Sequence, residues 1–396
     1  MRQPDNKILK VGIVGAGGAG LSQYYHFNSI KGCRTTAFFD PHDAGIKRAQ
    51  ALSPLILATK NFDDFLNAPV DIVSVCSPDK THTEYIVKSL AAGKHVLCEK
   101  PLTDSLNDCR AILQAEKNAS GCVMAVQHQM RFLPVHLKMK EIIQGGKLGK
   151  IFYMEGFYVH NLTQRAKLYD LWRFRDNATP LVYSGCHFVD LLRWLLEDEV
   201  TEIFAMANNI AFPEYPESDL NIAFLRFRSG ILGKVITAFG AGRPQDHSVR
   251  IYGNEQSIEN NLLFDKDGHF QVFHRPFIHN TFLPQNSSLR NKLGAWYLNA
   301  KSVLISRAVE SLMTGWRMKD YSYSVQSYPL RVYEHSYAVN ASITDFIDAI
   351  RRGRKPKCRA IDAAKTVVTC LAGVESYRAG RVVPLGKYWL KEFNDT

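Results

Sequence analysis

The chain has 396 residues, more than one hydrophobic core of ordinary size holds together, so two domains are the first expectation. With 46% hydrophobic and 22% charged residues, it is neither disordered nor fibrous nor of low complexity. Its 49 Lys and Arg outnumber its 38 Asp and Glu, a net charge of +11 that raises nucleic acid, membrane surfaces and anionic substrates as candidate partners.

The distribution of this charge argues against nucleic acid. Residues 1–130 carry a net charge of only +2, so +9 belongs to the remainder of the chain. The densest basic run lies between two helical patterns and is broken by Gly and Pro, which is typical of a solvated connection. It consists of Arg351, Arg352, Arg354, Lys355, Lys357 and Arg359. We therefore expect no nucleic-acid partner.

Nothing in the sequence indicates a membrane segment or an oxidising compartment. The first residues contain no glycine-free apolar region with a small-residue cleavage site, and no run of about 18 apolar residues occurs. The eight cysteines show neither a CxxC motif nor a zinc-ligand spacing. We expect a cytoplasmic protein with buried thiols, no membrane association and no metal.

In chain order, the first part alternates short apolar runs with amphipathic stretches. We predict strands at 8–14, 34–39, 71–76, 94–98 and 122–126, separated by helices such as 81–92. This alternation predicts a doubly wound α/β domain with a parallel sheet over residues 1–127.

From residue 128 the pattern changes. A helix at 133–144 precedes strands at 151–159, 202–210, 219–228, 231–239 and 247–252, and helices at 337–352 and 360–379 close the chain. Gly230 separates two alternating runs as a hairpin turn would. We predict a second α/β domain over 128–396, with a large, mostly antiparallel open sheet. The aromatic-rich stretch 274–330 fits neither pattern and would be a structural flap, an oligomer contact or a lid over the substrate.

The strand at 8–14 runs directly into Gly15-Ala16-Gly17-Gly18-Ala19-Gly20, which satisfies the GxGxxG pattern of dinucleotide-binding domains. Gly15 would permit the tight turn, Gly17 would let a pyrophosphate approach the backbone, and Gly20 would allow close packing of helix and strand. The first N–H groups of the helix, at Gly18 and Ala19, would bind the anion.

Asp40 ends the second strand, 20 residues beyond the last glycine of the motif. Its carboxylate would accept hydrogen bonds from the adenosine ribose hydroxyls and repel a 2′-phosphate, which favours NAD over NADP. Lys47 and Arg48 lie within two helical turns and would favour the phosphate, so NADP stays open as the second cofactor.

Glu99-Lys100-Pro101 follows the fourth predicted strand at its carboxyl end, where open α/β sheets bind ligands. Pro101 restrains the backbone of Lys100 to an extended conformation, so the ammonium group projects from a fixed point.

Five segments, in order and spacing, resemble the glucose-fructose oxidoreductase and inositol dehydrogenase (Gfo/Idh/MocA) family: GIVGAGGAG, DIVSVCSPDKTHTEYIVKSLAAGKHVLCEKPLT, RFLP, WR and GCHFVDLLRWL. The resemblance covers about residues 1–260 and the closing helices. It implies a Rossmann domain, a C-terminal α/β domain whose open sheet often forms dimer or tetramer contacts, and nicotinamide-dependent oxidation or reduction of sugars and polyols. We therefore expect a homodimer or homotetramer.

The resemblance also implies catalytic roles. Lys100 corresponds to the lysine that meets the substrate hydroxyl, and His187 to the histidine that acts as acid/base. Inositol-dehydrogenase-like members have an aspartate four residues before that histidine, where this chain has Tyr183. Because the usual pKa of His lies near neutrality, we predict that His187 is the general acid/base, that Lys100 polarises the reacting oxygen, and that Tyr183, on the same helix face, completes the hydrogen-bond chain.

Further residues are predicted around these three. Ser77, His82 and Glu99 would join the glycine motif, Asp40 and Lys100 in the cofactor pocket. Asn161 resembles an asparagine that binds inositol hydroxyls in relatives. The predicted substrate contacts are Asn161, His160, Arg131, Trp172 and Arg173.

Together these features favour an NAD-dependent dehydrogenase acting on a secondary CH–OH of a carbohydrate: a sugar, a polyol such as inositol, a sugar acid, a glycoside or a nucleotide sugar. Two alternatives use the same residues. One is an NAD-dependent glycosidase or lyase that oxidises a ring carbon transiently; the other is a non-catalytic regulator that binds NAD or a sugar.

Overall fold

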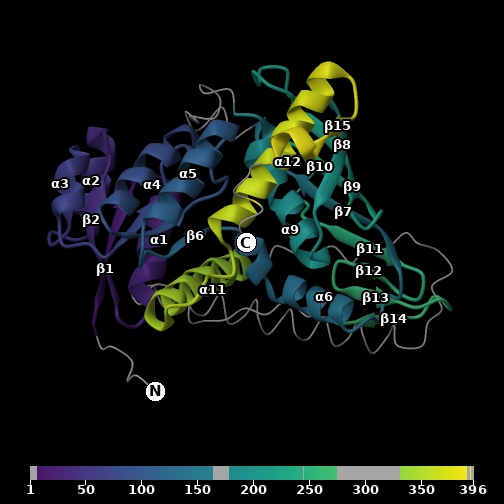
Figure 1. The fold of residues 1–396 in the computed structure, drawn as a ribbon, viewed down its shortest axis with the longest axis horizontal. Helices are drawn as coiled ribbons and strands as arrows, with labels where there is room; N and C mark the ends of the chain where they lie inside the picture. Colours follow the sequence, from purple (N-terminus) through teal and green to yellow (C-terminus); the bar gives the residue numbers. More distant parts are fainter. Residues whose placement is uncertain (1–6, 164–177, 244, 274–330, 390–392, 394–396) are drawn as a thin grey trace.

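The computed structural model describes residues 7–163, 178–243, 245–273, 331–389 and 393. Two sheets, each covered by helices, form the two halves of the molecule, and two long helices near the C-terminus lie between and below them (Figure 1). The predicted stretch 274–330 lies outside the described residues, so its three interpretations stay predictions.

The first sheet has six parallel strands in the order β3-β2-β1-β4-β5-β6. The side chains of β4 are buried throughout, as expected for a parallel sheet with helices on both faces. The strands are β1 (Leu9–Val14), β2 (Cys33–Phe39), β3 (Leu57–Thr59), β4 (Ile72–Val75), β5 (His95–Cys98) and β6 (Met124–Val126). The helices are α1 (Gly18–Ser29), α2 (Asp43–Leu52), α3 (Phe62–Asn67), α4 (His82–Ala91) and α5 (Leu106–Asn118). The predicted doubly wound parallel sheet is confirmed.

The second sheet has nine strands in the order β14-β13-β12-β11-β7-β10-β9-β8-β15, and its pairs are antiparallel except β7 with β10. Gly230, at φ 89°, forms the predicted hairpin turn between β9 and β10. The strands are β7 (Ile151–Val159), β8 (Val200–Asn208), β9 (Leu220–Phe227), β10 (Leu232–Ala238), β11 (Val249–Gly253), β12 (Ser257–Glu259), β13 (Leu262–Phe264), β14 (Phe270–Val272) and β15 (Val383–Pro384). The prediction of a large, mostly antiparallel sheet is thus confirmed, with one parallel pair at its centre.

Helix α9 (Cys186–Leu196) packs on one face of this sheet, next to α6 (Pro134–Gln144). Close approach occurs at Gly156 in β7, where an added Cβ would lie 2.3 Å from the ring of Phe188. The absence of a side chain at Gly156 therefore lets α9 lie directly on β7, which brings the start of α9 to the end of the strand.

The two closing helices belong to both halves of the molecule. Helix α11 (Arg331–Arg352) places Ile343 and Phe346 in the core beneath the first sheet. Helix α12 (Ala360–Ala379) contributes Val367 to the core of the first half and Cys370 to that of the second. The residues on either side of the predicted boundary at 127/128 form different sheets, and α12 contributes to the cores of both.

Basic residues at the α11–α12 connection form ion pairs and hydrogen bonds with other parts of the chain. Arg354 pairs with Asp345 and Asp348, both at 2.8 Å, and the guanidinium of Arg351 donates to the carbonyl oxygen of Lys31 at 3.0 Å. These contacts fit a structural connection. In the part of the chain that the structure describes, no helix is both long and apolar enough to cross a bilayer.

Candidate active site

The glycine loop joins β1 to α1 and has the backbone geometry that a dinucleotide requires. Gly15 has φ 93°, a left-handed conformation that favours glycine, and an added Cβ at Gly20 would lie 1.8 Å from the carbonyl oxygen of Gly15. At Gly17 and Gly18 an added Cβ would meet no atom within 4 Å. The loop is therefore tight on its inner side and open on its outer side.

The N-terminus of α1 opens onto this free space. Gly17 is the N-cap residue and offers no side chain to accept the first N–H groups of the helix. Uncapped N–H groups at a helix N-terminus bind anions well. The loop residues therefore fit the pyrophosphate of a dinucleotide.

Asp40, at the end of β2, is buried and fixed beside the loop. One carboxylate oxygen accepts from the backbone N–H of Ala16 and the other from that of His42, both at 2.9 Å. Gly45 packs against this carboxylate so closely that an added Cβ would lie 2.1 Å from Cγ of Asp40. Arg48 donates from Nε to the carbonyl oxygen of Ala16 at 2.8 Å. A carboxylate oxygen accepts more than one donor, so Asp40 retains capacity for ribose hydroxyls.

His82 connects the loops that follow β4 and β5. Its Nε2 lies 2.9 Å from the carbonyl oxygen of Ser77, and its Nδ1 lies 3.0 Å from that of Pro101. The imidazole is 1% exposed, so it braces the two loops from inside. His82 thus supports the two loops, and its predicted contact with a cofactor stays a prediction. The Ser77 hydroxyl accepts from that of Thr81 at 2.8 Å.

Glu99 is linked to the helix that begins at the glycine loop. Its Oε1 accepts a hydrogen bond from Nε2 of Gln23 in α1 at 3.0 Å. This contact ties the loop after β5, which carries Lys100, to the loop after β1.

Lys100 reaches from the first half of the molecule to the second. Its Nζ donates to the carbonyl oxygen of Tyr183 at 3.2 Å and lies 4.4 Å from the centre of the Tyr183 ring. Tyr183 belongs to a π-helical turn, Leu181–Gly185, that leads directly into α9. Such turns are rare and occur frequently at functional sites. The predicted α-helix over both Tyr183 and His187 is therefore two segments, with His187 in the α-helical one.

His187 lies in the first turn of α9, 5% exposed, with its ring stacked on that of Tyr158 at 5.5 Å between centres and 8° between planes. Burial, reinforced by the charge of Lys100 and by neighbouring histidines, lowers the pKa of His187 well below its usual value. Nδ1 of His187 has no hydrogen-bond partner among the described residues. The imidazole is therefore neutral at neutral pH and able to accept a proton.

A buried ion pair supports this helix from behind. Arg131 donates from Nε and Nη2 to the two carboxylate oxygens of Asp190 at 2.7 and 2.6 Å, and from Nη1 to the carbonyl oxygen of Lys357 at 3.2 Å. Burial opposes ionisation of Asp190, but Arg131 and His128 lower its pKa to about 2. These contacts of Arg131 anchor α9, and a substrate contact by Arg131 stays a prediction.

Of the other predicted substrate residues, the structure describes two. His160 and Asn161 follow β7 directly; Asn161 is exposed, and its Oδ1 accepts from the N–H and hydroxyl of Thr163. Trp172 and Arg173 lie outside the described residues. The structure thus brings Lys100, Tyr183 and His187 together, and places His160 nearby through Tyr158.

The sequence did not point to three residues at this site. Tyr158 stacks on both His160 and His187, His247 lies against Tyr158 at 4.6 Å between ring centres, and His128 is buried beside Asp190. Side chains alternate between the two faces of a strand, so Tyr158 could have been predicted to lie on the face of β7 that α9 covers. His247 precedes a strand far along the chain and belongs to no motif, so no sequence signal could have pointed to it.

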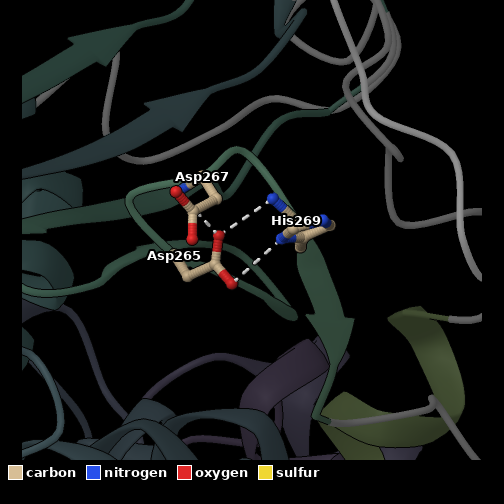
Figure 2. Close-up of side chains that lie close together, drawn as sticks. All are labelled: Asp265, Asp267 and His269. Atoms are coloured by element: carbon tan, nitrogen blue, oxygen red, sulfur yellow. Dashed lines mark hydrogen bonds and ion pairs between the residues drawn. The ribbon is translucent and has the colours of Figure 1, made fainter.

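Three side chains elsewhere approach one another as metal ligands do. Asp265, Asp267 and His269 lie in the exposed turn between β13 and β14 (Figure 2). One oxygen of Asp265 accepts from the backbone N–H groups of Asp267 and His269, at 3.0 and 2.9 Å. These bonds explain the arrangement as a turn stabilised by an aspartate side chain.

Comparison with known proteins gives two family matches. Residues 9–128 match the oxidoreductase family with an NAD-binding Rossmann fold, and residues 136–259 match the GFO/IDH/MocA C-terminal domain. An inositol 2-dehydrogenase of Rubrobacter xylanophilus is 26% identical over 259 residues, which is 64% of this chain and 72% of that protein. An inositol 2-dehydrogenase of Rhodococcus erythropolis is 31% identical over 231 residues, 57% and 64% of the two chains.

Solved structures share the fold. The myo-inositol 2-dehydrogenase of Lactobacillus plantarum superposes with a TM-score of 0.73 at 19% identity, over 96% of this chain and 99% of that one. The scyllo-inositol dehydrogenase of Lactobacillus casei with bound NAD(H) and scyllo-inositol has the same TM-score at 17% identity, over 96% and 99%. Two matched domains, in the order and positions that the sequence predicts, show that the chain belongs to the GFO/IDH/MocA family of oxidoreductases, with an NAD-binding Rossmann domain.

Proposed function

We propose that this protein oxidises a secondary CH–OH of a sugar, sugar derivative or polyol with NAD, or catalyses the reverse reduction. The observation that carries the proposal is the meeting of Lys100, from the carboxyl end of the parallel sheet, with the helical segment that carries His187. A neutral imidazole can accept the proton of an alcohol, and a cation that donates a hydrogen bond to the same oxygen stabilises the negative charge that develops on it.

The chain's own residues would perform the proton chemistry. Lys100 donates a hydrogen bond to the hydroxyl oxygen of the substrate and so orients it. His187 accepts the hydroxyl proton, because its lowered pKa keeps the ring neutral. When bound, NAD supplies the acceptor for the hydride that leaves the carbon bearing the hydroxyl group, and that carbon becomes a ketone. In the reverse direction the protonated His187 returns the proton to the oxygen.

The substrate class rests on the relatives. Their names include inositol 2-dehydrogenases, a scyllo-inositol 2-dehydrogenase (NAD(+)) of Bacillus subtilis and a 1,5-anhydro-D-fructose reductase of Ensifer adhaerens. All of these names describe oxidation or reduction of a polyol or a sugar, so the chain is proposed to act on such a molecule.

We propose NAD rather than NADP as the cofactor. The fixed carboxylate of Asp40 beside the glycine loop supports this preference, since it would repel a 2′-phosphate. Arg48, whose charge would favour the 2′-phosphate of NADP, donates a hydrogen bond from Nε to the carbonyl oxygen of Ala16. An Asp40→Ser variant is expected to narrow the ratio of kcat/KM between NAD and NADP; a wild type that prefers NADP would overturn the assignment.

The open face of the second sheet supports a homodimer or homotetramer. Tyr252, Leu232, Phe224 and Met206 are exposed and lie on the face that α9 does not cover. In the middle of this face, Glu155 is buried between two basic side chains, so its charge is already compensated. Light scattering is expected to give a dimer or tetramer, and Phe224→Asp to shift it toward the monomer.

The experiment that tests the function is a screen of inositols, sugars, sugar acids, glycosides and nucleotide sugars with NAD and NADP, read as nicotinamide absorbance. Formation of NADH in step with a ketone supports the dehydrogenase. Cleavage of a glycoside without accumulation of NADH would instead indicate a glycosidase or lyase, and cofactor binding without turnover of any compound would indicate a regulator.

A further inference from the structure

Two histidines from different strands meet beside the proposed acid/base. His160 follows β7, and His247 precedes β11; the backbones of Val159 and Asp246 pair in an antiparallel bridge and so set the two rings side by side. Their Nε2 atoms are 2.8 Å apart, which is a hydrogen bond between two imidazoles.

Both rings are held against Tyr158. The ring centre of Tyr158 is 4.4 Å from that of His160, 4.6 Å from that of His247 and 5.5 Å from that of His187. The histidine pair is therefore one aromatic ring away from the group proposed to take the substrate proton. A substrate whose reacting carbon lies at His187 and Lys100 would bring a more distant substituent to this pair by reaching past the ring of Tyr158.

The pair has a specific chemical capacity. A bond between two Nε2 atoms holds one proton, since one ring donates and the other accepts. If the pair takes up a second proton, both Nε2 atoms become donors and the direct bond is lost. A carboxylate between the rings would accept from both donors, and the single positive charge gained by the pair would balance the carboxylate.

The charged groups around the histidine pair also favour a negatively charged ligand. Asp246, next to His247, is paired with Arg243 at 3.1 Å and accepts from the hydroxyl of Ser248. The amide of Gln245 contacts the His247 ring, and the groups that act on nearby His187 are Lys100 and other histidines. The described carboxylates Asp190 and Asp246 already have cationic partners. Of these groups, the carboxylates are already paired, Lys100 adds a positive charge near His187, and the Gln245 amide supplies a hydrogen-bond donor beside His247.

We propose that the His160–His247 pair binds a carboxylate of the substrate, so that the substrate class is a sugar acid, an aldonate or uronate, rather than a neutral polyol. This inference rests on the proposed function for the reaction itself. His160 and His247 are then specificity-determining residues, and binding of the acid is accompanied by uptake of a proton.

The test compares matched pairs of compounds, D-glucuronate against D-glucose and D-galacturonate against D-galactose, by kcat/KM with NAD. The acid of a pair is expected to be favoured at least about tenfold, and His247→Gln to reduce that preference by a similar factor. His269→Gln, on the exposed turn between β13 and β14, is the matched control and should leave the preference unchanged. Equal rates on acid and neutral sugar, or a preference for a sugar phosphate over the uronate, would overturn the inference.

A second measurement does not depend on the variants folding. Calorimetric titration of the wild-type protein, loaded with NADH, with glucuronate in two buffers of different ionisation enthalpy should reveal proton uptake, and KM for glucuronate should rise with pH through the neutral range. Binding without proton uptake contradicts the inference. If no compound is turned over but glucuronate binds with proton uptake, the proposed function fails while the carboxylate site stands.

Discussion

The Nζ of Lys100 lies 4.4 Å from the centre of the Tyr183 ring and 3.2 Å from the carbonyl oxygen of the same residue. Lys100 is therefore positioned by the ring and backbone of Tyr183, and neither contact uses the phenol hydroxyl. Tyr183 occupies the place of an aspartate in the inositol-dehydrogenase-like sequences that this chain resembles. The relationship suggests that Tyr183 orients Lys100, whereas the sequence predicted a link in the proton chain.

The two roles of Tyr183 predict different kinetics. Tyr183→Phe keeps the ring and the carbonyl, so kcat should stay within about threefold, whereas Tyr183→Leu removes a cation–π contact of about 1–2 kcal/mol and should lower kcat about tenfold. Steady-state kinetics on the substrate found in the screen measures both. If Tyr183→Phe is as damaging as Tyr183→Leu, the hydroxyl takes part in proton transfer.

Two glycines of the loop are expected to affect different properties: Gly17 the affinity for NAD, and Gly20 the stability of the protein. In Gly17→Ala the new methyl group enters open space, so the melting temperature should be unchanged while NAD affinity falls. In Gly20→Ala the methyl would collide with the carbonyl of Gly15, so the protein itself should be destabilised. Thermal unfolding and NAD titration of both variants decide this; an intact NAD affinity in Gly17→Ala would show that the pyrophosphate binds elsewhere.

The buried pair of Arg131 and Asp190 predicts a large loss of stability. Asp190→Asn removes the negative charge closest to the buried guanidinium of Arg131 and leaves only Asp362, at 3.8 Å, to balance it, which should cost about 3–5 kcal/mol in the free energy of unfolding. Denaturant unfolding measures the loss. A cost below about 1 kcal/mol, typical of exposed ion pairs, would show that the pair does not anchor α9.

Two buried histidines predict acid sensitivity. Burial lowers the pKa of His128 to about 4, and burial with the charge of His335 lowers that of His26 to about 4. Histidines of the unfolded chain titrate near 6.5, so below that pH the unfolded state binds more protons and stability falls until the folded pKa is passed. Each residue should cost about 3 kcal/mol by then.

The measurement is the free energy of unfolding at several pH values between 7 and 4, for the wild type and for His128→Phe. Neither ring nitrogen of His128 has a hydrogen-bond partner among the described residues, so the apolar ring should be tolerated. The variant should lose stability less steeply than the wild type as the pH falls. Parallel curves would mean that His128 does not resist protonation in the folded protein.

Much of the fold could be predicted from the sequence because its elements carry local patterns. The parallel strands are apolar runs, the GxGxxG motif follows β1, and Gly230 marks a hairpin. The three-residue strand β3 is too short to show a period, and β12, β13 and β14 are equally short. Local sequence also cannot reveal that α12 divides its buried face between two cores.

In the candidate site, too, some residues can be predicted from the sequence and others cannot. Lys100 and His187 are predictable because they lie within long motifs that the chain shares with a family. The pairing of His160 with His247 depends on an antiparallel bridge between segments 87 residues apart, which no local pattern records. The π-helical turn at Tyr183 is likewise invisible, since its four-residue spacing from His187 reads as one α-helix.

The central claim, proton transfer by His187 beside Lys100, is tested most directly by the pH dependence of substrate oxidation in the wild type and in His187→Gln. Because the pKa of His187 is lowered, kcat of the wild type, measured at saturating substrate, should stay level as the pH falls through 6.5 and decline only below it. His187→Gln should retain NAD affinity, lose about 100-fold or more in kcat and lose the acid decline. A variant with unchanged kcat and an unchanged pH profile would contradict the account.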